Sequence, residues 1–236
     1  MSETGAQASR LHERGARIAL CKEQPGRLRS SRFGNAVEPL NTSPITLEGE
    51  HVRLAPLSLA HTDALIAAAG DGELWNTKVT IIPDALGMPA YIQAALDGQS
   101  SGKELPFVII RKPANEIVGS TRFYDMSAKD RKCTIGYTWL AKSAQRTAVN
   151  SECKLLLLTQ AFETWNCVRV ELVTDVLNQQ SRTAILRLGA KQEGILRKHL
   201  ILPTGRVRDS VFFSITDDEW PVVKQGLLSR LQTSAS

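Results

Sequence analysis

The sequence lacks the patterns that define several large classes of protein. No apolar run approaches the ~20 residues that cross a bilayer, so we expect no membrane-spanning segment. The four cysteines are scattered and form neither a CxxC pair nor a Cys/His cluster, so we expect no structural metal. The sequence also lacks a Walker loop, a serine–histidine–acid order and a metal-ligand helix. Because no secretory leader is recognisable, we expect a cytoplasmic protein.

The first 43 residues differ in composition from the rest. They hold seven Arg and Lys against four Glu, or +3 of the formal net charge of +5, and one aromatic residue, Phe33. Such a segment cannot bury enough apolar surface to offset its ordering entropy. We therefore predict a disordered basic extension over residues 1–43 and a folded domain over 44–236. Besides a plain tail, the extension could be explained by a start assigned too far upstream, an organelle-targeting peptide or a nucleic-acid-binding arm.

From Ile45 onward, short apolar strands and amphipathic helices follow one another, separated by turn residues. The order of these elements predicts an α+β or mixed α/β fold. Strands are expected at 45–47, 52–54, 107–110, 117–124, 133–140, 169–177, 192–202 and 207–215, and helices at 59–69, 88–96, 147–165, 179–188 and after 216.

One strand–loop–helix segment, residues 133–162, carries the clearest chemical signal. It reads CTIGYTWL, then AKSAQRTAVN, then SECKLLLLTQAF. A strand that leads through a short loop into a helix points unpaired backbone N–H groups and the positive end of the helix dipole at one place. Phosphate groups bind at such places, although most strand–loop–helix units bind nothing.

The segment IGYTWLAKSAQRTAVNSECKLLLLTQAFE resembles the acetyl-coenzyme A-binding motif of GNAT-superfamily N-acetyltransferases, most closely the RimJ/RimL branch, which acetylates N-terminal amines of ribosomal proteins. The likeness continues in VELVTDVLNQQSRTAILRLGAKQEGILRKHLILPTGRVRDSVFFSI and covers about residues 45–220. It implies a GNAT-like fold: a mostly antiparallel twisted sheet, one splayed parallel strand pair and helices on both faces. It also implies acetyl-CoA as co-substrate and no metal.

The resemblance assigns cofactor contacts to two places. Where strand 133–140 splays from strand 169–177, free backbone groups of Trp139, Leu140 and Ala141 would pair with the pantetheine amides. The following loop would hold the pyrophosphate at the helix N-terminus. The implied cofactor-binding residues are Trp139, Leu140, Ala141, Gln145, Arg146, Thr147, Ala148, Val149, Asn150 and Asn178.

The phosphate loop departs from the family pattern at two positions. Arg146 and Ala148 stand where the family has glycines, which allow close approach to a ligand or an unusual dihedral angle. Three interpretations follow: normal binding assisted by the Arg146 guanidinium, weakened affinity, or a domain that has lost activity.

The resemblance also implies a direct transfer of the acetyl group to a neutral amine. A backbone N–H near Leu140 would polarise the thioester carbonyl, and Ser181 would donate a proton to the departing thiolate. The alternative for Ser181 is a place in a helix first turn capped by Asn178. Thr134 replaces a glutamate that related sequences often carry. The groups left to hold a proton-accepting water, or to act directly, are Asp125, Glu171, Asp175 and His199.

Three side chains are candidates for the acceptor pocket: Trp75, Tyr137 and His199. Tyr137 and Trp139 alternate along one strand and share a face, for which core packing is the favoured interpretation and pocket lining the alternative. Arg197 and His199 are likewise expected on one face, opposite Lys198, where a solvated surface competes with contact to an acceptor.

These observations predict an acetyl-CoA-dependent N-acetyltransferase whose acceptor is a protein N-terminus or a small amine. The alternative from another class is a non-catalytic GNAT-like domain that binds CoA or a partner as a sensor. Nucleic-acid binding is not expected, since the folded part carries a formal net charge of only +2. No membrane partner is expected either, and the protein is expected to be a monomer or homodimer.

Overall fold

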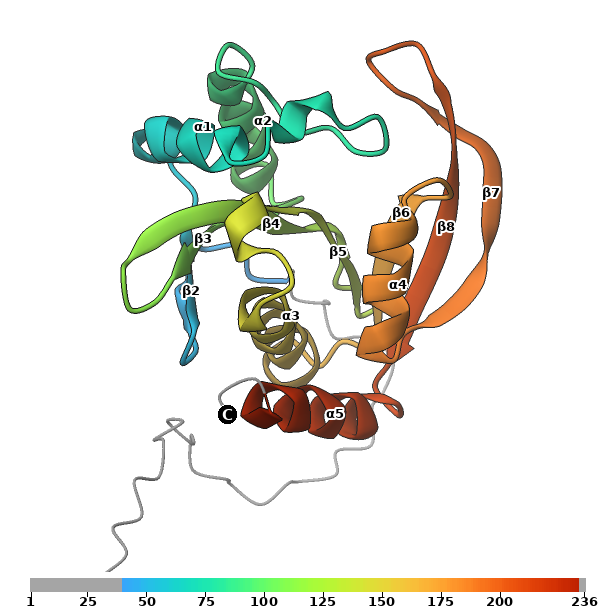
Figure 1. The fold of residues 1–236 in the computed structure, drawn as a ribbon. Coiled ribbons are helices and arrows are strands. Elements are labelled where there is room, and N and C mark those ends of the chain that lie inside the picture. The colour runs from blue at the N-terminus through green and yellow to red at the C-terminus, as the bar shows by residue number, and fades with distance from the viewer. Residues whose placement is uncertain (1–39, 234–236) are drawn as a thin grey trace, which may run out of the picture. The chain divides into compact units, whose positions relative to one another are not determined.

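The centre of the molecule is an eight-stranded sheet (Figure 1), in a computed structural model that describes residues 40–233. The strand order is β1-β2-β3-β4-β5-β6-β8-β7. Neighbouring strands are antiparallel except β5 and β6, which run parallel, and this confirms the predicted α+β fold class. The strands are β1 (Leu47–Glu48), β2 (Val52–Pro56), β3 (Leu105–Arg111), β4 (Glu116–Ser127), β5 (Lys132–Leu140), β6 (Arg169–Asp175), β7 (Lys191–Ile201) and β8 (Val207–Thr216).

Helices cover both faces of the sheet, as the resemblance implied (Figure 1). On one face α1 packs against β4 and α2 against β3. On the other face α3 packs against β1, β2 and α5, and α4 contacts β6 and α5. The helical segments are η1 (Leu59–His61), α1 (Thr62–Gly70), η2 (Leu74–Asn76), α2 (Met88–Ser100), η3 (Lys142–Ala144), α3 (Ala148–Thr159), the π-helical turn η4 (Gln160–Thr164), α4 (Gln179–Leu188) and α5 (Trp220–Thr233).

The core lies along β3 and β4, which helices cover on both sides. The first six residues of β3 are buried in succession, because a strand covered on both faces needs no polar alternation. The Phe107 ring meets Phe123 edge-on with centroids 6.2 Å apart, and Phe123 meets Trp165 at 4.7 Å. Aromatic contacts therefore join the central strands to the segment that follows α3.

Element boundaries follow the predicted ones where a capping residue marks them. Helix α4 has the predicted bounds, with Asn178 as its N-cap and Gly189 at φ +104° after its last residue. Helix α2, in contrast, continues past its expected end at residue 96 and through Gly98. Gly98 serves close packing, since a Cβ there would lie 2.7 Å from Cδ of Glu104. The predicted helix over 147–165 ends in the π-helical turn η4.

Most of the predicted N-terminal extension lies outside the described residues. The described part of it, residues 40–43, contacts the domain. Leu40 packs against the core, and the Thr42 carbonyl accepts a hydrogen bond from Gln99 Nε2 at 3.0 Å. The boundary after residue 43 and the disorder before it stay predictions.

Candidate functional site

The parallel pair β5–β6 separates soon after it begins. The two strands pair only from Lys132 to Thr134 on β5 and from Arg169 to Glu171 on β6. Beyond Thr134, β5 remains paired with β4 but no longer with β6. The predicted splay is therefore confirmed, and it leaves one edge of β5 open from Ile135 to Leu140.

Leu140 presents its peptide groups to that open edge. In the antiparallel ladder it lies opposite Gly119, and the next residue, Ala141, donates its N–H to the Val118 carbonyl at 2.7 Å. Because backbone groups alternate in direction along a strand, the N–H and C=O of Leu140 face away from β4. The Leu140 carbonyl accepts a hydrogen bond from Gln145 Nε2 at 2.9 Å.

Two neighbouring residues do not have the free backbone groups that were expected. Besides the Ala141 N–H bond to Val118, the Ala141 carbonyl accepts from the Ala144 N–H at 2.9 Å. The Trp139 carbonyl faces β4, since a Cβ at Gly119 would lie 2.0 Å from its oxygen. The prediction of three free peptide units is therefore wrong for Trp139 and Ala141, because strand alternation places only one of the three on the open edge.

A β-bulge lies just before these residues. Gly136 pairs with Arg122 and Trp139 pairs with Ser120, so two residues of β5, Tyr137 and Thr138, lie opposite one residue of β4. Tyr137 has a left-handed backbone with φ +49°. Trp139 is buried at 5% exposure, but Tyr137 is 49% exposed. Core packing was favoured for both side chains, and it is correct for Trp139 and wrong for Tyr137.

The loop after β5 leads through η3 to the N-terminus of α3. Arg146 has φ +62°, in the region that favours glycine, which explains why a glycine is usual at this position in the resembling family. Its side chain is exposed. Thr147 caps α3, since its Oγ1 accepts from the Val149 N–H at 3.3 Å. The loop therefore presents a cation and helix-terminal amides together, while Ala148 and Asn150 lie in the first turn of α3.

The N-termini of α3 and α4 lie next to each other. Gln145, in the loop before α3, accepts a hydrogen bond from Gln180 Nε2 of α4 at 3.1 Å. Asn178 caps α4, because its Oδ1 accepts from the Ser181 N–H at 3.0 Å. Both helices begin after the carboxyl ends of β5 and β6, so two helix dipoles point their positive ends at the opening.

The candidate acid and bases have different surroundings. Ser181 is half-buried in the first turn of α4, and its hydroxyl makes no hydrogen bond to the residues that the structure describes. Glu171 accepts from Arg169 Nε at 2.9 Å. Asp175 is fully buried, accepts from the Leu177 N–H at 2.9 Å and is paired with Arg206. Glu171 and Asp175 thus have cationic partners already.

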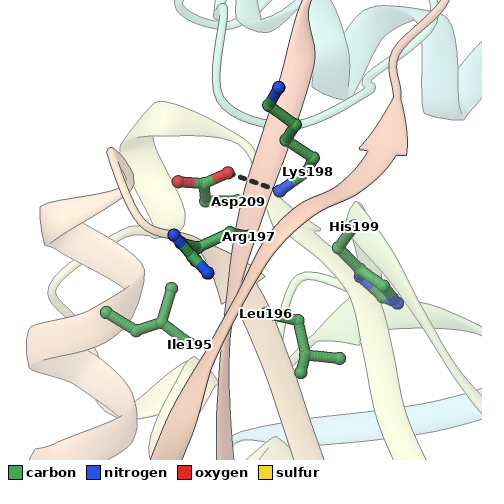
Figure 2. A pocket seen from close by; sticks show the side chains of 6 residues that line it. All are labelled: Ile195, Leu196, Arg197, Lys198, His199 and Asp209. Carbon is green, nitrogen blue, oxygen red and sulfur yellow. Dashed lines mark hydrogen bonds between the residues drawn. The ribbon is translucent and has the colours of Figure 1, made fainter.

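The predicted acceptor-side residues are spread over three elements. Trp75 in η2 is 36% exposed, and His199 on β7 has Nδ1 3.0 Å from Ser210 Oγ. A second bulge interrupts β7, where Lys198 has φ +54° and its N–H donates to Asp209 Oδ1 at 2.7 Å. The bulge lines a surface hollow of about 920 Å³ (Figure 2).

The second bulge also changes the direction of one side chain. His199 lies on the face of Ser210, whereas Arg197 points to the other side of the strand (Figure 2). The prediction that Arg197 and His199 share a face is wrong, because the register shift between Leu196 and Leu200 breaks the alternation.

Three buried charged residues were not singled out from the sequence: Arg122, Glu152 and Lys154. The Glu152 carboxylate of α3 accepts three backbone N–H bonds, at 2.7–2.8 Å, from residues 50–52. Lys154 Nζ donates to Thr138 Oγ1 of the bulge at 2.8 Å, and burial lowers the pKa of its ammonium. Helical periodicity places Glu152 beside Val149, and Lys154 beside Leu157 and Leu158, all of which are buried, and this spacing was the available signal.

Comparison with known proteins bears on this arrangement. Residues 51–191 match the family model described as "Acetyltransferase (GNAT) domain". A curated relative is YdaF of Bacillus subtilis (strain 168), which is named as a candidate ribosomal N-acetyltransferase. The two sequences are 31% identical over 44% of this chain and 56% of YdaF, so the match spans little more than half of that relative. Within residues 40–233, no helix is long and apolar enough to cross a membrane.

Solved structures agree with the family match. An acetyltransferase candidate from T. thermophilus is 33% identical, with a TM-score of 0.72 over 81% of this chain and all of its own. Mycobacterium smegmatis RimJ, solved with CoA-disulfide, shares the fold at 21% identity, with a TM-score of 0.65 over 80% of this chain and 93% of its own. The family-model match over residues 51–191, more than half of the chain, shows that the chain belongs to the GNAT acetyltransferase family.

Proposed function

We propose that this protein transfers the acetyl group of acetyl-CoA to a primary amine by direct attack. The observation that carries the proposal is the opening between β5 and β6, where the Leu140 peptide groups face outward beside the N-termini of α3 and α4. A peptide-like chain fits this edge as an added strand, and a diphosphate fits the helix termini. Acetyl-CoA contains both chemical parts.

In this proposal the cofactor contacts divide between the strand and the loop. Leu140 pairs with a pantetheine amide, and the loop and first turn of α3 bind the pyrophosphate through their N–H groups. Arg146, exposed beside them, donates a bidentate hydrogen bond to a phosphate oxygen. The proposed pyrophosphate-binding residues are Gln145, Arg146, Thr147, Ala148, Val149 and Asn150, with Asn178 at the adjacent end of α4.

Acetyl-CoA supplies a thioester-activated acetyl group. The Leu140 N–H donates to its carbonyl oxygen, and the Ser181 hydroxyl, which has no other partner in the described part, donates a proton to the thiolate sulfur. Since Glu171 and Asp175 are already paired with cations, we propose that a water held by Asp125, or His199 itself, accepts the proton of the amine. Tyr137 forms one wall of the acceptor site, and Trp75 and His199 are proposed as further walls.

A protein N-terminus is the acceptor class we favour. The RimJ/RimL branch, which the sequence resembles, acts on such amines, and YdaF is named as a candidate ribosomal N-acetyltransferase. We keep a small amine as the alternative acceptor. A CoA-binding sensor without turnover is a second candidate function, favoured by Arg146 and Ala148 at the glycine positions.

The test combines binding with turnover. Calorimetric titrations with acetyl-CoA and with CoA are followed by a thiol-release assay over N-terminal peptides and small amines. We expect both ligands to bind and thiol to be released only when an amine is present. Binding without release under any acceptor would favour the sensor. A folded protein that binds neither ligand would refute the proposal.

A further inference from the structure

A buried arginine lies between two aromatic rings on the face of the sheet that α2 covers. Arg122 of β4 is only 3% exposed. Its Cζ lies 4.9 Å from the ring centroid of Tyr91 on α2 and 4.0 Å from that of Tyr137 at the bulge of β5. Tyr137 is half exposed, and its ring lies over one face of the guanidinium. We call these three residues the Arg122 platform.

One edge of the Arg122 guanidinium is paired and the other is not. Nη1 donates to Glu104 Oε2 at 2.7 Å. Nε and Nη2 are buried and form no hydrogen bond with the described residues. The Tyr91 hydroxyl lies close enough to interact with the guanidinium, but it also has no hydrogen-bond partner of acceptable geometry. Buried donors without partners are rare in folded proteins, and such a set indicates a ligand oxygen.

The aromatic contacts continue toward the far side of the opening. The Tyr137 ring meets Tyr124 edge-on with centroids 5.2 Å apart. Arg208 of β8 lies near Tyr124, and its Nε is a further buried donor without a partner. A second cation therefore lies beyond the platform, across the splayed strands.

The platform lies beside the proposed reaction centre. Arg122 pairs in register with Gly136, and Tyr137 precedes Leu140 by three residues on the same strand. An acceptor whose amine reaches the open edge of β5 at Leu140 therefore passes the platform. Three strand residues span about 10 Å, so a peptide acceptor of a few residues reaches from Leu140 to the platform.

We infer that the free edge of Arg122 and the Tyr91 hydroxyl bind a backbone carbonyl oxygen of a peptide acceptor, so that the protein selects peptide N-termini over alkylamines and polyamines. This inference rests on the proposed function and narrows its acceptor class. Because Glu104 already neutralises Arg122, the free edge suits a neutral carbonyl better than a second carboxylate. Polyamines offer no oxygen to these donors, and the cations Arg122 and Arg208 would repel their additional ammonium groups.

The test measures kcat/KM at saturating acetyl-CoA for four acceptors: a tripeptide amide, glycine, propylamine and spermidine. Arg122→Lys keeps the charge beside Glu104 but removes the planar fork. Tyr91→Phe removes only the hydroxyl that lies beside the guanidinium. We expect each variant to lower the ratio of tripeptide to propylamine kcat/KM about tenfold, through KM. Arg111→Lys is the matched control, because Arg111 is a partly exposed arginine of the neighbouring strand β3, paired with Glu116 and away from the platform rings.

The outcomes separate the inference from the proposed function. If the wild-type protein uses tripeptide and propylamine equally well, or if Tyr91→Phe and Arg122→Lys lower both by the same factor, the inference is wrong and acetyl transfer stands. A preference for glycine over the tripeptide would show that a carboxylate is bound, which also contradicts it. If no acceptor releases thiol from acetyl-CoA, the proposed function fails and the inference fails with it.

Discussion

Arg146 allows a sharp test, because its backbone and its side chain are expected to act in opposite directions. Its φ of +62° lies in the left-handed region, which costs a residue with a Cβ about 1–2 kcal/mol. Glycine removes this cost but loses about 0.5–1 kcal/mol through its greater freedom in the unfolded chain. Arg146→Gly should therefore raise the free energy of unfolding by about 0.5–1 kcal/mol, or the melting temperature by about 2 °C.

Thermal denaturation of the wild type, Arg146→Gly and Arg146→Ala checks this reasoning. Arg146→Ala is the matched control, since alanine keeps the Cβ and the strain while removing the guanidinium. We expect Arg146→Gly alone to melt at a higher temperature than the wild type. An equal rise in Arg146→Ala would show that removal of the charge, not relief of backbone strain, is responsible. A fall in Arg146→Gly would refute the strain argument.

The same variants test the cofactor contact. If the exposed Arg146 guanidinium binds a phosphate, its removal should cost about 1 kcal/mol, which corresponds to an acetyl-CoA Kd about fivefold higher. Both variants should show this loss, and added salt should reduce it. Unchanged or tighter binding by Arg146→Gly would mean that the arginine is only tolerated in the loop.

Three further predictions concern Glu152, Ser181 and Lys154. Glu152→Gln replaces one oxygen of a carboxylate that accepts three backbone N–H bonds with an NH2 group, which cannot accept them. The melting temperature should therefore fall by at least about 4 °C. An unchanged melting temperature would contradict the structural role of Glu152. Ser181→Ala should lower kcat at least about tenfold. Its melting temperature should not change, because Asn178 bonds to the backbone N–H of residue 181 and not to the hydroxyl, whereas Asn178→Ala should cost about 1 kcal/mol of stability. Normal turnover by Ser181→Ala would exclude the proton-donor role. Burial lowers the pKa of the Lys154 ammonium, so the folded protein binds the ammonium proton less tightly than the unfolded chain does. The free energy of unfolding should therefore rise as the pH rises toward the ordinary lysine pKa of about 10.4. In urea titrations at several pH values, Lys154→Met should lose this rise, and an identical pH profile in both proteins would contradict the argument.

The sequence was most informative where one residue determines a local structure. Asn178 and Gly189 mark the ends of α4 because a cap and a left-handed residue act within a single turn. The splay of β5 from β6 and the loop before α3 also agree with expectation, since the motif there is long and continuous in the chain.

Features that depend on the register between strands were not predictable. The bulges at Tyr137 and Lys198 follow from pairing with residues on β4 and β8, and they reverse expectations for the side chains of Tyr137 and Arg197. Alternation alone also could not show which peptide group faces the opening. Arg122 had a readable signal, a charged residue within an otherwise buried strand, but its partners come from α2, β5 and Glu104, which are distant in the chain.

The three bonds to Glu152 bear on where an independently stable fragment can start. The family match begins at residue 51, but the carboxylate also binds the N–H of Glu50. A shortened chain that begins after β2 would leave a negative charge inside the protein without the amides that solvate it. Expression of the catalytic region alone therefore requires the first hairpin, and a protease cut inside that turn should loosen helix α3.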